Sequence, residues 1–275
     1  MPIVGIVSAG QMGAALGAAL NGVRVVTTLE GRSERTARLA GAAGLEVLPT
    51  LRAVTEAADV VLSVTPPGQA RAAARLLAKS TDSNTVVADL NAVSPTTMAA
   101  IADDLAGRRV VDGAISGPPP APGGQTTIYL AGADAGLVAA LPWAASVETV
   151  VVGAAIGSAS AVKMCTGSVY KGLTALITQA LRTAEANGVL AHVVRDLDRN
   201  RLAQVAGVAR SAPKAHRFVA EMREVAATQE AAGLTPELFT SIAEVYAEIA
   251  RTRLAEGYPE EVTDLSPAEI VARLA

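Results

Sequence analysis

The sequence predicts an α/β domain with a doubly wound, mostly parallel sheet, followed by an all-α domain that a long interdomain helix joins to it. Short β-branched runs alternate with Ala-rich helical stretches in the first half of the chain, as in βαβ units. Several of these runs, such as VVLSV at residues 60–64 and TVVAD at residues 85–89, are nearly continuous in apolar residues, which is typical of strands buried on both faces. After Gly153 the strand patterns end. We therefore expect domains over residues 1–157 and 158–275.

The first domain should contain short strands separated by helices. The β-branched runs predict strands over residues 3–7, 23–28, 60–64, 85–89 and 110–112, with two more over residues 126–131 and 147–152. Residues 11–20 and 33–42, which follow the first and second of these strands, are rich in alanine and have apolar residues at helical spacing, so we expect helices there.

The second domain should be helical throughout. A long helix is expected over residues 158–187, ended by Asn187-Gly188, with shorter helices over residues 213–232 and 236–254. Ser266 to Glu269 has the pattern of an N-cap, a first-turn proline and a capping box. Apolar residues at intervals of three and four predict the buried face of the long helix: Val162, Cys165, Val169, Leu173, Leu176 and Ala180.

Composition excludes several classes of protein. The 275 residues carry a net charge of −3, which does not favour a nucleic-acid-binding surface. One cysteine and two histidines leave no basis for an intrachain disulfide or for a metal site made of several cysteines, and make a two-histidine metal centre improbable. No apolar run reaches the length of a membrane span, and the N-terminus runs directly into a strand pattern. We expect a cytoplasmic protein without a metal.

The turn after the first strand is the first candidate site. Small residues between a strand and a helix let the backbone approach a pyrophosphate, which the N–H groups and the dipole of the helix N-terminus then bind. A tight packing turn without a ligand is the alternative. The residues expected to bind a dinucleotide in this Rossmann-like turn are Ser8, Ala9, Gly10, Gln11, Met12 and Gly13.

The end of the second strand would meet the adenosine ribose. An acidic residue there would bind the 2′-hydroxyl of NAD, whereas an arginine would pair with the 2′-phosphate of NADP. Arg32 followed by Ser33 fits the phosphate better than Glu30 fits the hydroxyl. We therefore expect NADP in preference to NAD, with an ordinary solvated loop as the alternative.

Loops beyond the later strands should complete the ligand site, because ligands of open α/β sheets bind at the carboxyl ends of the strands. Val64, Thr65 and Asn91 would line the nicotinamide side. The Pro/Gly-rich segment 112–124 offers Ser116 and Gly117 to a small polar ligand, or forms a rigid surface loop.

Three residues of the long helix are candidates for chemistry. Lys163 lies near its start among small and apolar residues, which could desolvate the ammonium and lower its pKa toward an acid/base range. Tyr170 and Lys171 share roughly the same helical face, with Lys171 about 12 Å further along at ~1.5 Å per residue. A solvated charge is the alternative for both lysines.

The segments IVSAGQMG, GRS, DLNAVSP, DGAISG and GSASAVKM resemble, in this order, the β-hydroxyacid dehydrogenase superfamily, which includes 6-phosphogluconate dehydrogenase and the imine reductases. The C-terminal half resembles a branch whose phosphogluconate-dehydrogenase-like domain has a poorly known role. The resemblance implies a homodimer with interlocked C-terminal helical domains. It also implies that Ser116 and Gly117 bind substrate and that Lys163 is the catalytic acid/base.

Three positions depart from the superfamily pattern. Ser8 replaces the first glycine, about two extra residues near Leu29 precede Arg32, and Gly167 stands where an amide side chain usually holds substrate. The sequence thus predicts hydride transfer between NADP(H) and a small alcohol/carbonyl pair, with Lys171 and Tyr170 near the substrate. An imine reductase on the same fold and a non-catalytic dinucleotide-binding regulator are the alternatives.

Overall fold

The computed structural model describes residues 2–202, 205–262 and 264–275. The chain divides into two compact units, residues 1–164 and 165–275, and each is described by itself. The division lies inside the long helix α7 (Ser158–Ala186), which begins in the first unit.

The first unit is built on one eight-stranded sheet in the order β3-β2-β1-β4-β5-β6-β7-β8. Neighbouring strands pair in parallel, except that β6 and β7 are antiparallel. The strand order reverses between β1 and β4, so a crevice for ligands is expected outside their carboxyl ends. The strands are β1 Ile3–Val7, β2 Arg24–Thr28, β3 Glu46–Leu48, β4 Val60–Ser63, β5 Val86–Asp89, β6 Arg109–Ser116, β7 Thr126–Ala131 and β8 Val147–Gly153.

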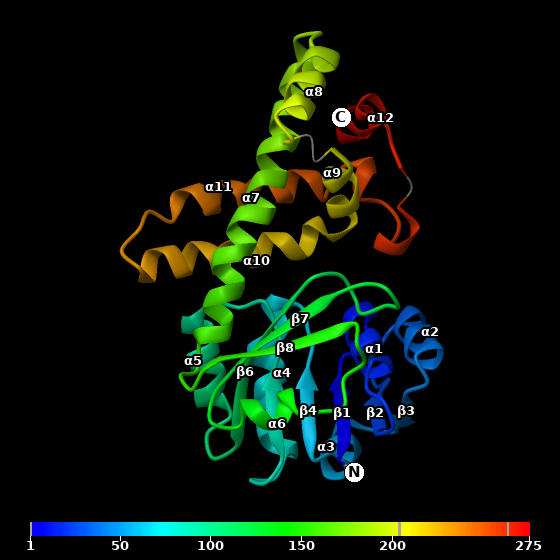
Figure 1. Ribbon diagram of the computed structural model, residues 1–275, viewed down its shortest axis with the longest axis vertical. Helices are drawn as coiled ribbons and strands as arrows, with labels where there is room; N and C mark the ends of the chain where they lie inside the picture. The colour runs from blue at the N-terminus through cyan, green and yellow to red at the C-terminus, as the bar shows by residue number, and fades with distance from the viewer. Residues whose placement is uncertain (1, 203–204, 263) are drawn as a thin grey trace. The chain divides into compact units, whose positions relative to one another are not determined.

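Helices cover both faces of this sheet (Figure 1). Leu16 of α1 packs in one apolar cluster with Ile6 and Leu62, whereas Leu77 and Met98 belong to the cluster on the opposite face. Adjacent residues of β4 alternate between these two clusters, as the pleat requires. The helices are α1 Gln11–Ala18, α2 Glu34–Ala42, α3 Leu51–Ala57, α4 Ala70–Ser80, α5 Pro95–Asp104 and α6 Ala135–Ala139, with a 3₁₀ turn at Pro67–Gln69.

The second unit is helical over its described residues. α10 and α11 pack against each other, and Phe218 meets Tyr246 edge to face with the ring centroids 5.3 Å apart. After α7 come α8 Leu190–Arg199, α9 Val205–Ser211, α10 Ala215–Ala231, α11 Glu237–Ile249 and α12 Pro267–Leu274, with 3₁₀ turns at Ala212–Lys214, Arg253–Ala255 and Pro259–Glu261. No described helix is long and apolar enough to cross a membrane.

The predicted fold class is confirmed, and the differences lie in individual elements. β3, with three residues, and α9, with seven, are short and were not predicted, and neither was the ten-residue α8. α11 ends at Ile249 instead of residue 254, since the chain tightens into a 3₁₀ turn there. β6 extends to Ser116, because pairing with β7 continues the strand into the segment expected to be a loop.

The predicted buried face of the long helix is wrong. Val169 is 64% exposed, Leu176 is 60% exposed, and Cys165 is also exposed. The buried apolar residues of this helix are instead Ala159, Met164, Ala175, Ile177, Leu181 and Ala184. Alanine-rich sequence leaves two faces of this helix similarly apolar, so spacing alone could not select the face that packs within the chain.

Candidate functional site

The turn between β1 and α1 has a backbone shaped for close approach. Ser8 has φ +72°, in the left-handed region that glycine adopts more easily. A Cβ on Gly13 would lie 2.4 Å from the Ser8 carbonyl oxygen, so only glycine fits there. A Cβ on Gly10 would meet nothing within 4 Å, so this part of the backbone faces open space.

The N-terminus of α1 is available to an anion. Gly10 is the N-cap and provides no side-chain hydrogen bond, and the first turn has no acidic residue. The first N–H groups of a helix have no partner within the helix, and the helix dipole favours negative charge there. An open turn followed by uncapped N–H groups fits the diphosphate of a dinucleotide.

The loop after β2 presents Arg32 to solvent. Its guanidinium forms no hydrogen bond or ion pair with any described residue. Ser33 caps α2 by accepting the N–H of Thr36 at 3.3 Å. Glu30 is exposed, and its backbone N–H donates to the Thr28 hydroxyl at 3.2 Å. The exposed arginine and the start of a helix form a suitable site for a phosphate group.

The carboxyl ends of β4 and β5 are joined through Asn91. Its Oδ1 accepts the N–H of Thr65 at 2.6 Å, and its Nδ2 donates to Asp89 Oδ2 at 2.8 Å and to Ser63 Oγ at 3.3 Å. Asp89 is buried, and this burial raises the pKa of its carboxyl to about 7. The Thr65 hydroxyl oxygen is buried without a hydrogen-bond partner among the described residues, so a ligand could satisfy it. Val64 N–H donates to the Val7 carbonyl at 3.1 Å, which ties this loop to the end of β1.

The end of β6 meets Lys163 of α7. Lys163 Nζ donates to the Ile115 carbonyl at 2.7 Å, which places the ammonium beside the residue that precedes Ser116. Gly117 has φ +112°, and a Cβ there would lie 2.8 Å from the Gln125 carbonyl oxygen, so this turn also requires glycine. Lys163, Ser116 and the dinucleotide turn all belong to the first unit.

Lys171, in the second unit, already has a partner. Its Nζ lies 2.7 Å from Glu221 Oε1, with side chains only 15% and 8% exposed, and 4.9 Å from the centroid of the Phe218 ring. The ion pair is close but poorly aligned, since Glu221 Oε1 accepts no well-oriented hydrogen bond. Tyr246 OH donates to the Lys171 carbonyl at 2.8 Å, and burial raises the pKa of that phenol. Tyr170 is 66% exposed.

The catalytic and binding roles of these residues stay predictions, although the structure gives most of them a common location. The cofactor-binding candidates gather at the carboxyl edge of the parallel strands, with Ser116, Gly117 and Lys163 in the same unit. Sequence reasoning gave no role to Asp89, Asp112 or Glu221, which are all buried. A carboxylate within an otherwise apolar strand was the available signal for Asp89 and Asp112.

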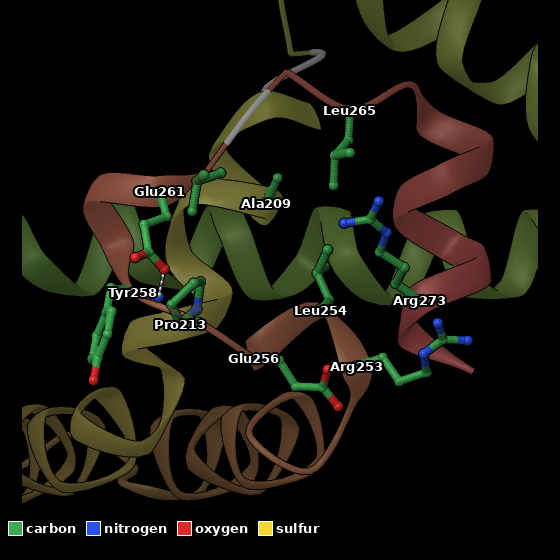
Figure 2. A pocket seen from close by; sticks show the side chains of 11 residues that line it. Ala209, Pro213, Arg253, Leu254, Glu256, Tyr258, Glu261, Leu265 and Arg273 are labelled. Carbon is green, nitrogen blue, oxygen red and sulfur yellow. Dashed lines mark hydrogen bonds between the residues drawn. The ribbon is translucent and has the colours of Figure 1, made fainter.

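Two hollows lie elsewhere on the molecule. One, of about 190 Å³, lies in the second unit, lined in part by Pro213, Leu254 and Arg273 (Figure 2). Another, of about 620 Å³, lies in the first unit between the second half of α1 and residues 120–125. Neither contains a predicted catalytic or cofactor-binding residue, so we do not place the candidate site in either.

Two family models match parts of the chain. Residues 3–93 match the family described as NADP oxidoreductase, coenzyme F420-dependent, and residues 184–249 match a domain of unknown function, DUF1932. No curated protein matches the chain.

Solved structures resemble nearly the whole chain. A 3-hydroxyisobutyrate dehydrogenase from Mycobacterium tuberculosis is 21% identical with a TM-score of 0.69, over 100% of this chain and 99% of its own. The chain has the 3-hydroxyisobutyrate dehydrogenase fold. This fold combines an N-terminal domain of the NADP-binding type with a helical C-terminal domain.

Two further structures share this 3-hydroxyisobutyrate dehydrogenase fold. A conserved protein of unknown function, described as structurally similar to 3-hydroxyacid dehydrogenases, is 29% identical with a TM-score of 0.66, over 90% of this chain and 96% of its own. An imine reductase from Myxococcus stipitatus, in complex with NAD⁺, is 18% identical with a TM-score of 0.53, over 90% of this chain and 93% of its own. The fold therefore serves more than one chemistry.

Proposed function

We propose that the protein is an NADP(H)-dependent oxidoreductase that acts on a small alcohol/carbonyl pair of the 3-hydroxyacid type, with Lys163 as the general acid/base. The observation that carries this proposal is the position of Lys163. Its ammonium is bonded to the strand that ends at Ser116, in the unit that contains the open dinucleotide turn. A proton donor in the same unit as such a turn suits reduction of a carbonyl group.

The cofactor would be held by groups that the turn and the loops expose. Residues 8–13 would bind the diphosphate, Arg32 and Ser33 the 2′-phosphate, and Val64, Thr65 and Asn91 the nicotinamide side. When bound, the nicotinamide supplies or accepts the hydride. The F420-related family model spans only residues 3–93, so it bears on the nucleotide-binding part alone.

Lys163 would move one proton at Nζ. In the reducing direction the ammonium donates a proton to the carbonyl oxygen of the substrate, and in the oxidising direction the neutral amine accepts the hydroxyl proton. A correctly placed acid/base typically contributes ~100-fold to ~10,000-fold. Ser116 and Gly117 would hold the polar end of the substrate.

We further propose that two copies of the chain form a homodimer through their helical domains. The outward face of α7 supports this, because Val169, Leu176 and Tyr170 are more than half exposed and Leu173 is only partly buried. Contiguous exposed apolar surface of this kind is typical of an interface. The partner's helices would complete the substrate pocket.

The test is a turnover assay with a matched pair of lysine variants. We expect NADPH consumption with at least one member of a panel of aldehydes, ketones, 3-oxo acids and cyclic imines. Lys163→Ala should lower turnover at least about 100-fold while NADPH titration stays normal. Lys79→Ala, at an exposed lysine of α4, should change neither. Unchanged turnover in Lys163→Ala would exclude the acid/base role.

The same panel separates two other functions. An imine reductase would consume NADPH with cyclic imines only, which the shared fold of the Myxococcus stipitatus enzyme makes a specific alternative. A dinucleotide-binding regulator would bind NADPH with no turnover of any substrate, and Lys163→Ala would then have no effect.

A further inference from the structure

Asp112 is a buried carboxylate in the middle of β6 that reaches the N-terminus of α7. Its oxygens accept the N–H of Gly157 at 2.8 Å, of Ala159 at 2.9 Å and of Ser160 at 3.2 Å, and also the Ser160 hydroxyl at 2.7 Å. One side chain thus satisfies three backbone donors at the start of a helix, from 45 to 48 residues away in the chain. An N-cap normally comes from the residue at the helix end itself.

The same strand also holds Lys163. Lys163 is three residues beyond Ser160, and its Nζ donates to the carbonyl of Ile115, which is three residues beyond Asp112. β6 therefore contacts α7 at two points, once at the backbone of the first turn and once at the lysine ammonium. All of these residues belong to the first unit.

The entry of the chain into α7 is fixed by the same contacts. Gly157 has φ +99°, and a Cβ there would lie 3.2 Å from the Pro95 Cβ, so glycine is required where its N–H meets Asp112. The carboxylate is anchored to a strand with paired neighbours on both sides. The start of α7 has little freedom to rotate or to unwind while these bonds remain.

We propose that Asp112 is a positioning residue for Lys163: by capping α7 from β6, it fixes the place of the Lys163 ammonium against the end of the same strand. Asp112 does not touch substrate or cofactor in this proposal. It acts through the first turn of the helix. Only the expected effect of Asp112 on turnover rests on the proposed function. The effect of Asp112 on the position of Lys163 can be measured without a substrate.

The chain has only four lysines, which are Lys79, Lys163, Lys171 and Lys214. A protein labelled with isotopes at lysine alone therefore gives few ammonium signals in NMR spectra. Each signal can be assigned by replacing one lysine at a time. The readout is hydrogen exchange of each ammonium group. In Asp112→Asn we expect exchange at Lys163 to rise about tenfold, the factor that follows from loss of one strong cap. Exchange at the other three lysines should not change. Ser160→Ala, which removes only the hydroxyl donor, should produce a smaller rise at Lys163.

Asp134→Asn is the matched control, because Asp134 pairs with Arg109 in the same unit and forms no hydrogen bond or ion pair with α7 among the described residues. It should leave Lys163 exchange unchanged. With an active substrate, Asp112→Asn should lower kcat with little effect on NADPH affinity.

Unchanged exchange at Lys163 in folded Asp112→Asn, or an equal rise at all four lysines, would overturn the proposal. If Asp112→Asn does not fold, Ser160→Ala decides: a rise confined to Lys163 supports the proposal, and no rise refutes it. A selective rise at Lys163 in a protein without turnover would refute the proposed function and leave the positioning role intact.

Discussion

Asp89 makes the stability of the first unit depend on pH, and the size of this effect follows from its environment. Asp89 is the last residue of β5, and its carboxyl is buried. It pairs with Asp112 in the register of β5 and β6. Burial, and to a lesser degree the nearby Asp112 carboxylate, raise its pKa from 3.8 to about 7. A difference of this size between the folded and the unfolded state corresponds to about 4 kcal/mol.

The sign follows from proton binding. Between pH 3.8 and pH 7 the folded state holds a proton that the unfolded state has released, so raising the pH destabilises the folded state. From pH 5 to pH 7 the free energy of unfolding should fall by about 2.3 kcal/mol. The slope is about 1.4 kcal/mol per pH unit near pH 5, about half of that at pH 7, and approaches zero above pH 8. Burial also raises the pKa of Asp112, which adds a contribution of the same sign.

Urea unfolding at several pH values between about 5 and 8.5 measures this slope. Trp143, the single tryptophan, lies in the first unit and reports on the part of the chain that contains Asp89. Asp89→Asn has no proton to lose, so its unfolding free energy should vary much less with pH. Loss of the Asn91 hydrogen bond shifts stability by about 1–3 kcal/mol at every pH, so the slope is the quantity to compare.

Asp104→Asn serves as the control. Arg71 lowers the pKa of Asp104, so Asp104 is ionised in both states throughout this pH range, and the variant should keep the wild-type slope. If Asp89→Asn also keeps that slope, Asp89 is not the group that releases the proton, and the reasoning from its burial is refuted.

Three further predictions concern the cofactor turn and the helical unit. Gly13→Ala should lower the free energy of unfolding by about 1–3 kcal/mol in thermal unfolding, because the new Cβ would lie 2.4 Å from the Ser8 carbonyl oxygen. Gly10→Ala should keep wild-type stability, because its Cβ would meet nothing within 4 Å, and should weaken only NADPH binding. Arg32→Ala should weaken NADPH about tenfold or more and leave NADH unaffected in titrations; equal loss for both would remove Arg32 from the phosphate site. Lys171→Met should cost about 3–5 kcal/mol in urea unfolding by leaving the buried Glu221 carboxylate unpaired, and adding Glu221→Gln should recover part of that loss.

The sequence predicted best what is decided locally. Residues 3–7 form β1 as predicted, because an apolar β-branched run followed by a glycine-rich turn is complete within a few residues. The capping box from Ser266 to Glu269 is present for the same reason. The end of α11 was placed too late, because nothing in the residues after Ile249 breaks a helix as strongly as proline does.

Contacts between segments that are far apart in the chain could not be predicted from the sequence. The ion pair of Lys171 with Glu221 joins residues of α7 and α10, and no spacing rule connects them. The exposed stripe at Val169 and Leu176 was predicted to be core, because periodicity shows that a face is apolar without showing what covers it. Such errors arise where the packing partner lies far along the chain, or outside it.

The two buried aspartates of the first unit perform the same task on adjacent strands. Asp89 and Asp112 face each other in the register of β5 and β6. Asp89 binds the backbone N–H and the side chain of Asn91, whose amide oxygen holds the loop at Thr65, and Asp112 binds the first N–H groups of α7.

In each case a carboxylate anchored in the sheet orders a segment that leaves the sheet edge where ligands of this fold class bind. Donors from those segments favour the charged form of each carboxyl, whereas burial opposes it, and at Asp89 the charge of Asp112 opposes it as well. We therefore expect the conformation of both segments to respond to the protonation of these two carboxyls, because each segment is held by hydrogen bonds to one of them.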